Sequence, residues 1–147
     1  MAAVTQLYDH TVRRFTSGEL HYAQHTFKVM LLGFIIPDLS HTTLLQVKQG
    51  YNPVYAPGYW PLNGVVLTNF NIVPSGTSGA KLIADNINML MSEGMSGVYT
   101  HIVIYDDSDG FDAPLLVVSL NKEVTVPPGE RVIINWDEQG IVAFAMR

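Results

Sequence analysis

Glycine and proline divide this chain of 147 residues into short segments, and their spacing limits what the chain can fold into. Twelve Gly and eight Pro are spread along the sequence. Either residue interrupts a helix, Pro because it lacks a backbone donor and Gly because of its conformational freedom. Little room is left for long helices, and the segments between the breaks have the patterns of strands.

Strands are predicted at seven places: 26–32, 65–73, 99–105, 115–120, 124–126, 131–136 and 141–145. Alternate residues of 131–136 are apolar, which is the period-two pattern of a half-buried strand. Seven or more short strands separated by turns indicate an all-β sandwich or barrel. One short helix is predicted within 38–47, with Asp38 and Ser40 as candidate N-caps.

Turn residues predict how the strands are joined. Pro127-Pro128-Gly129 is predicted to pair strand 124–126 with 131–136, and Glu138-Gln139-Gly140 to form the last hairpin. Loops rich in Gly and Ser are predicted at 74–79 and 92–97.

The first 25 residues show no sustained period, and their aromatic residues, Tyr8 and Phe15 among them, are scattered. Chain termini are loose unless tied down, so this segment is either an extended arm that becomes ordered on a partner or a first strand and loop. We therefore divide the chain into 1–25, the N-terminal arm or first strand, and 26–147, a β-sandwich domain.

The composition combines 48% apolar residues with only 14% charged ones, against about 25% charged in ordinary globular chains. Such a chain either keeps a polar, uncharged surface or covers apolar surface with a partner. The longest apolar run, 29–36, is far shorter than the ~20 residues of a membrane span. No secretory leader is visible and there is no Cys, so we expect an intracellular protein without disulfides or a membrane partner.

Charge is unevenly distributed. Residues 1–60 carry four basic and three acidic side chains, a net of +1, whereas 61–147 carry four basic and ten acidic ones, a net of −6. Neither part has a basic stripe that would neutralise phosphates, so we expect no binding to nucleic acid.

Two patterns suggest a metal site, and each lacks a necessary residue. His21 and His25 have ligand-like spacing, but no acidic residue lies between them as in a zinc protease helix. Aligning the acidic turn 106–112 on Gly110 places Tyr and Leu where an EF-hand loop requires Asp and Glu. We predict a surface His pair, a solvated acidic turn, and no metal or other cofactor.

Nucleophile motifs are also incomplete. The segments 76–79 and 94–97 are each one residue short of Gly-x-Ser-x-Gly, and no phosphate loop or dinucleotide fingerprint occurs. We predict no catalytic residues and no enzymatic activity.

The stretch 51–61 contains three Tyr and one Trp among three Pro and a Gly, so it cannot form regular structure. Aromatic residues on a rigid loop are typical of binding surfaces, but the same loop could fold back and cap the core. Replacing Trp60 by Ala separates the two, since loss of assembly supports contact and unfolding supports the cap. Our predicted partner contacts are Tyr8, Phe15, Tyr55, Tyr59 and Trp60.

An ordered series of short motifs resembles small virion structural proteins of tailed bacteriophages, of the capsid cement or decoration type. The series is HTFKVMLL (25–32), PD (37–38), HTTL (41–44), GVVLT (64–68), ADNI (84–87), VIYDD (103–107), APL (113–115), VIINW (132–136) and GI (140–141). The chain departs from that pattern at Asn86, where a second acidic residue is usual, and at 51–61, which is longer than the usual Gly-rich turn.

The resemblance implies a jelly-roll-like antiparallel β-sandwich with an extended N-terminal arm and one short helix. It also implies self-association, as a homodimer or homotrimer, and non-catalytic binding to the major capsid protein. Such a protein is made in the host cytoplasm and lies on the capsid surface of the virion.

The resulting hypothesis is a cement protein that binds and stabilises the lattice of the major capsid protein. One alternative is a phage tail or neck structural protein, which copy number per particle would distinguish. An alternative of another class is a small β-sandwich carbohydrate-binding module or enzyme. In every case the uneven charge predicts that solvent meets the acidic loops, Asp106–Asp112 above all.

Overall fold

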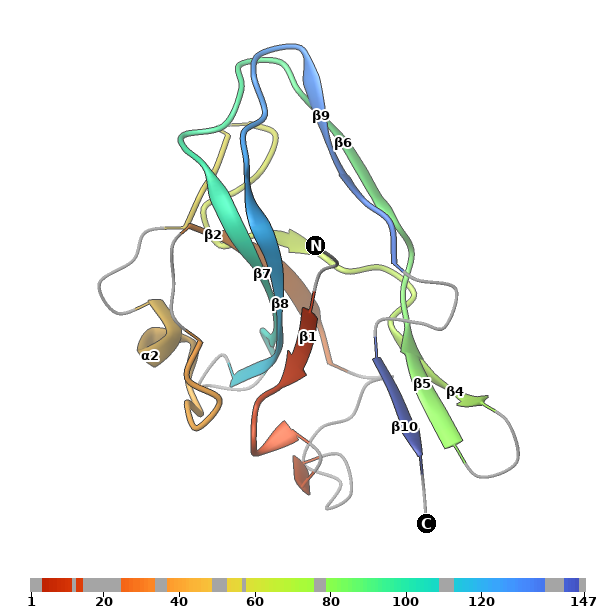
Figure 1. Cartoon of the computed structure of the whole chain (residues 1–147). Coiled ribbons are helices and arrows are strands. Elements are labelled where there is room, and N and C mark those ends of the chain that lie inside the picture. The colour runs from red at the N-terminus through yellow and green to blue at the C-terminus, as the bar shows by residue number, and fades with distance from the viewer. Residues whose placement is uncertain are drawn as a thin grey trace.

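The computed structural model gives an all-β fold (Figure 1), which confirms the all-β part of the predicted fold class. The residues it describes are 4–11, 13–14, 25–33, 37–48, 53–56, 58–75, 79–108, 113–136 and 142–145. Within them the strands form antiparallel sheets, accompanied by the short helix α2 (Leu44–Lys48).

A five-stranded antiparallel sheet forms the centre of the fold. Its order is β1 (Val4–Leu7), β8 (Ala113–Val124), β7 (Tyr99–Asp106), β2 (Phe27–Leu32) and β3 (Val65–Val66). β2 pairs with β7 from Phe27 opposite Asp106 to Leu32 opposite His101. The three inner strands contain or match the predicted segments 26–32, 99–105 and 115–120.

Both faces of this sheet are covered, which explains why its inner strands are apolar almost without interruption. In β2, Val29 and Leu31 belong to a core cluster on one face, and Met30 and Leu32 to a second cluster on the other. All four side chains are fully buried. The first part of the apolar run 29–36 is therefore a strand buried on both sides.

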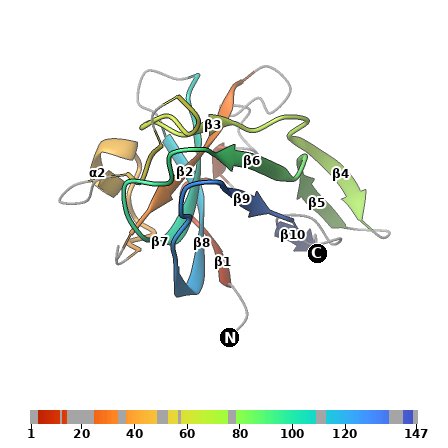
Figure 2. The same cartoon turned by 90° about the horizontal axis from the view of Figure 1, so that it is seen from above.

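A bent ribbon covers the first face. β5 (Gly79–Ile83) is followed after three residues by β6 (Ile87–Met91), and these two strands pair with β10 (Val142–Ala145) and β9 (Glu130–Ile134), respectively. β4 (Asn71–Ser75) pairs with the other edge of β5. Alternate residues of β6 and β9 enter the first core cluster, and Figure 2 shows this ribbon and α2 on opposite sides of the central sheet.

Helix α2 and the N-terminal residues cover the second face. Leu44, Val47 and Tyr8 join the second core cluster. Residues 1–25 were predicted to be either an extended arm or a first strand and loop. The described residues 4–7 form a strand, because β1 pairs with β8. Residues 15–24 lie outside the described part of the chain.

The start of α2 is set by a capping box. Thr43 Oγ1 accepts a hydrogen bond from Gln46 N (3.3 Å), and Gln46 Oε1 accepts one from Thr43 N (3.1 Å). Asp38 and Ser40, the predicted N-caps, instead bond to each other in an earlier turn. The helix therefore begins later than predicted.

For two predicted hairpins, the predicted partner strand is wrong. β8 runs to Val124, and the turn after it is followed by β9. This strand pairs with β6 and not with the predicted strand 124–126. The physical reason lies in the turn, because Gly129 N donates to Met91 O (2.9 Å) at the end of β6. The last strand, β10, pairs with β5 and not with the strand that precedes it.

The predicted strand 65–73 is two strands, β3 and β4. Asn69 adopts a positive φ of 53°, a left-handed conformation that ends an extended run. Leu67 N donates to Phe27 O (2.8 Å) and ties this turn to β2. Strands β5 and β6 were not predicted, and the predicted loop 74–79 overlaps the end of β4 and the start of β5.

Candidate functional site

The aromatic stretch of the sequence lies in a segment that is attached to β2 at both ends. We call the described residues of 53–67 the anchored segment. At its start, Val54 N donates to Leu31 O (2.8 Å), and at its end Leu67 N donates to Phe27 O (2.8 Å). Both ends of the segment are thus hydrogen-bonded to β2, and the central sheet fixes its path.

The middle of the anchored segment is held by two further pairs of hydrogen bonds. Tyr55 N donates to Ser96 Oγ (3.1 Å) and Tyr55 O accepts from Ser96 N (2.7 Å). Ala56 and Trp60 exchange both backbone bonds, at 2.9 and 2.8 Å. The Trp60 side chain is fully buried in the first core cluster, and its packing there holds this turn against the core.

The second half of the segment lies directly against the sheet. Gly64 has a φ of +88°, and a Cβ at this position would lie 2.0 Å from Val29 O. Beside it, the Tyr105 hydroxyl donates to Asn63 O (2.5 Å). Only glycine fits the required conformation and the close approach, so the sequence Asn63-Gly64 fixes the turn that leads into β3.

The anchored segment presents apolar side chains to solvent. Tyr55, Tyr59, Leu62 and Val66 are 39%, 37%, 51% and 54% exposed. Eight large hydrophobic side chains are exposed among the described residues, and these four lie within twelve residues of sequence. A rigid segment that displays aromatic and aliphatic groups can bind a partner with little loss of conformational entropy.

The structure separates the five predicted contact residues. Tyr55 and Tyr59 are on the surface of the anchored segment, Trp60 and Tyr8 are in the core, and Phe15 lies outside the described residues. The burial of Trp60 therefore agrees with the interpretation in which the stretch 51–61 folds back and caps the core. Burial, with a smaller effect of the nearby Asp38 carboxylate, raises the pKa of Tyr8 to about 12. The side chains of Tyr8 and Trp60 are buried within the chain and are not exposed for contact with a partner.

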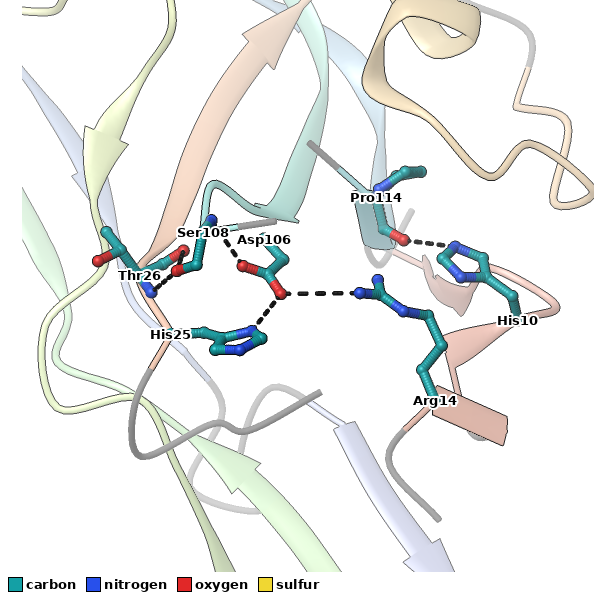
Figure 3. Close-up of polar contacts among 7 residues, drawn as sticks. All are labelled: His10, Arg14, His25, Thr26, Asp106, Ser108 and Pro114. Atoms are coloured by element: carbon teal, nitrogen blue, oxygen red, sulfur yellow. Dashed lines mark hydrogen bonds and ion pairs between the residues drawn. The ribbon is translucent and has the colours of Figure 1, made fainter. Parts of the chain in front are cut away.

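A second group of functional side chains surrounds Asp106 at the end of β7 (Figure 3). Asp106 is fully buried, with Oδ2 lying 2.6 Å from His25 Nδ1 and 3.8 Å from Arg14 Nη2. Its Oδ1 accepts a hydrogen bond from Ser108 N (2.8 Å). Ser108 in turn accepts a short hydrogen bond from the backbone N of Thr26, so the cluster joins the start of β2 to the turn after β7.

This cluster corrects two predictions. The acidic turn 106–112 was expected to be solvated, but its first carboxylate is buried, with His25 within hydrogen-bond distance and Arg14 as an ion-pair partner. Asp107 is partly exposed and pairs with Lys28 at 3.1 Å. His25 was expected in a surface pair with His21, but it is part-buried against Asp106. Residues 109–112 and His21 lie outside the described part of the chain.

Desolvation by burial lowers the pKa of His101, whose Nδ1 lies 2.7 Å from Thr100 Oγ1. The described residues contain no group of three or more His, Cys, Asp or Glu side chains that could hold a metal ion. None of the helices among them is long and apolar enough to cross a membrane.

Comparison of the chain with protein-family models, with curated proteins and with solved structures finds no match.

Sequence reasoning found the aromatic half of the anchored segment and missed the aliphatic half. Leu62 and Val66 follow the stretch 51–61, and Val66 lies at the start of the predicted strand 65–73, where apolar residues indicate burial. The signal that could have found them is the Asn63-Gly64 pair, which is typical of a tight turn and places its neighbours at the surface.

Proposed function

We propose that this chain is a non-catalytic virion structural protein, a capsid cement protein that binds the major capsid protein lattice and stabilises it. The proposal joins the resemblance of the ordered sequence motifs to the character of the anchored segment. It also includes association of the chain with its own copies as a homodimer or homotrimer.

The observation that carries the proposal is the rigid display of Tyr55, Tyr59, Leu62 and Val66. These groups are exposed although the same segment buries Trp60 completely, so the chain has the means to bury apolar side chains here and leaves four of them outside. Aromatic anchors on a preorganised backbone typically dominate the binding energy of protein interfaces.

The mechanism of a cement protein is linkage. A ligand that binds only the assembled lattice stabilises that lattice by mass action. Many weakly bound copies on a symmetric shell add through multivalency. Neither effect requires a catalytic group.

We include a jelly-roll-like sandwich in the proposal. Support comes from the nested antiparallel pairs β1–β8, β2–β7 and β4–β5, of which the first two join early strands to late ones. The adjacent strands β7 and β8 also pair with each other within the central sheet, which is a departure from a plain jelly roll.

The test is the copy number of the chain in purified particles produced by the genome that encodes it. Quantitative mass spectrometry against the major capsid protein, with a particle reconstruction, should give on the order of hundreds of copies on the outer shell. A few to a dozen copies on the tail axis would favour the tail or neck alternative. Absence from particles would overturn the proposal.

A further inference from the structure

The turn that leads into β3 contains the one Asn-Gly pair of the sequence, Asn63-Gly64. The other asparagines are followed by Pro, Phe, Ile, Met, Lys or Trp. Asparagine is chemically labile where the next backbone nitrogen can reach its side-chain carbonyl carbon, and glycine hinders that approach least because it has no Cβ. Asn63 is exposed, so water and base can reach its side chain. The sequence and the exposure together make Asn63 the most reactive asparagine of this chain.

In the folded chain, the nitrogen that would attack is held in a hydrogen bond. Gly64 N donates to Pro61 O (2.9 Å), which closes the turn 61–64. Asn63 O accepts a hydrogen bond from the Tyr105 hydroxyl (2.5 Å). Gly64 itself is buried against Val29 O. Attack requires Gly64 N to lose its proton and to move toward the Asn63 side chain, and these contacts oppose both changes.

We propose that Asn63 is a site of spontaneous deamidation, and that the reaction occurs when the turn 61–64 opens locally. Gly64 N gives its proton to a base and bonds to Cγ of Asn63, and the side-chain nitrogen takes up a proton and leaves as ammonia. Water then opens the resulting succinimide ring at one of its two carbonyls, giving aspartate or isoaspartate. No oxidant or reductant takes part. This inference is independent of the proposed cement function.

The isoaspartate product does not fit the position that the turn occupies. In it the main chain passes through the former side chain, which adds one backbone carbon between residue 63 and Gly64. Gly64 then cannot keep both its bond to Pro61 O and its close approach to Val29 O, where even a Cβ has no room. Deamidation therefore limits the lifetime of the anchored segment, because a turn that opens and reacts does not close again.

The test follows deamidation of the full chain over time in mildly alkaline buffer. Peptide mapping by mass spectrometry separates the asparagine, aspartate and isoaspartate forms at each position. In urea, where the turn is absent, residue 63 should react first among the asparagines. In the folded wild type the rate at residue 63 should be at least ~tenfold lower, because only locally opened molecules react. Tyr105→Phe removes one hydrogen bond of the turn and should raise the folded-state rate about fivefold.

Val132→Ala is the matched control, since Val132 is fully buried in β9 and does not belong to the anchored segment. It weakens the fold elsewhere, so its folded-state rate at residue 63 should stay at the wild-type value. Asn63→Gln should show no reaction at this position on the same timescale, because the longer side chain closes a ring far more slowly.

Three results would overturn the proposal. They are another asparagine that reacts first in urea, a folded wild type as reactive at residue 63 as the unfolded chain, and a Tyr105→Phe variant that reacts no faster than Val132→Ala. The product is tested separately, by refolding chains that carry isoaspartate at position 63. These should unfold at a lower urea concentration than unmodified chains, and equal stability would show that the turn accommodates the longer backbone.

Discussion

Gly64 is the residue at which the anchored segment comes closest to the central sheet. Two features disfavour a side chain at this position: the φ of +88°, and the separation of only 2.0 Å between a Cβ there and Val29 O. We expect Gly64→Ala to lower the free energy of unfolding by about 2–4 kcal/mol, measured by urea denaturation.

Gly58 provides a matched control. It has a φ of +79°, but nothing lies within 4 Å of a Cβ at that position. Gly58→Ala should therefore show only the backbone effect, about 1 kcal/mol. Equal losses for the two variants would mean that the close approach at Gly64 contributes nothing.

Trp60 is a core residue in this structure, so its truncation should act on stability. Trp60→Ala is expected to lower the free energy of unfolding by about 3–5 kcal/mol through loss of packing. Trp60→Phe should lose roughly half of that or less, since Nε1 has no hydrogen-bond partner within the described residues. A Trp60→Ala protein with wild-type stability that fails to assemble would return this residue to the interface.

Tyr8 gives a prediction for alkaline pH. Its pKa is raised to about 12 because burial disfavours the phenolate. The stabilisation of the neutral form is complete below pH ~10, the ordinary tyrosine value, and is lost as the pH rises through about 12. The difference absorbance titration of wild type minus Tyr8→Phe should show a single phenol ionising near that pH. An ionisation near pH 10 would contradict the burial.

At the scale of elements, the bend of the ribbon between β5 and β6 depends on a few polar groups. Asn86 Oδ1 accepts from Trp136 N (2.9 Å), and Asp85 O accepts from Trp136 Nε1 (2.9 Å). Asp85 Oδ2 also accepts hydrogen bonds from Thr68 and Asn69. The bend thus joins three separate parts of the chain.

Asn86 lies at this bend, and its contact predicts that an acidic residue should fit equally well. The bond to Trp136 N needs only a side-chain oxygen. Asn86→Asp should keep the free energy of unfolding within about 0.5 kcal/mol, whereas Asn86→Ala should lose about 0.5–1.5 kcal/mol in thermal or urea unfolding. A loss as large in Asn86→Asp as in Asn86→Ala would contradict this role.

The three inner strands of the central sheet were predictable from sequence, because a strand buried on both faces is mostly apolar. β5 and β6 were missed, since Gly79, Asn86 and Asn88 interrupt their apolar pattern. Strand partners were predicted less well than strands. A turn such as Pro127-Pro128-Gly129 indicates that the chain reverses, but the bond from Gly129 N to Met91 O, which selects β6, joins residues far apart in sequence.

The same limit applies to the sites. The aromatic and proline content of the stretch 51–61 marked it as a candidate binding surface. The sequence alone does not show that Trp60 points inward while Tyr55 and Tyr59 do not. The Asp106 cluster was mistaken for a solvated turn. Its partners, Arg14 and His25, come from elsewhere in the chain, and no local pattern records a long-range charge pair.

At the scale of the whole molecule, the low charged fraction of the chain has a structural counterpart. A sheet covered on both faces takes up much of the apolar content, and the remainder is exposed in part on the anchored segment. We propose that a partner covers these exposed apolar side chains. We therefore place assembly, with its own copies and with a capsid lattice, at the centre of the proposed function.

The most direct test is sedimentation velocity of the wild type and the Tyr55→Ser/Tyr59→Ser variant over a range of micromolar concentrations. Leu45→Ser is the control, because Leu45 is 78% exposed on α2 and does not belong to the anchored segment. We predict a dimer or trimer for wild type and Leu45→Ser. The double variant should have an unchanged melting temperature and a dissociation constant raised at least ~tenfold. A wild type that stays monomeric, or a double variant that assembles as tightly as wild type, would contradict the account.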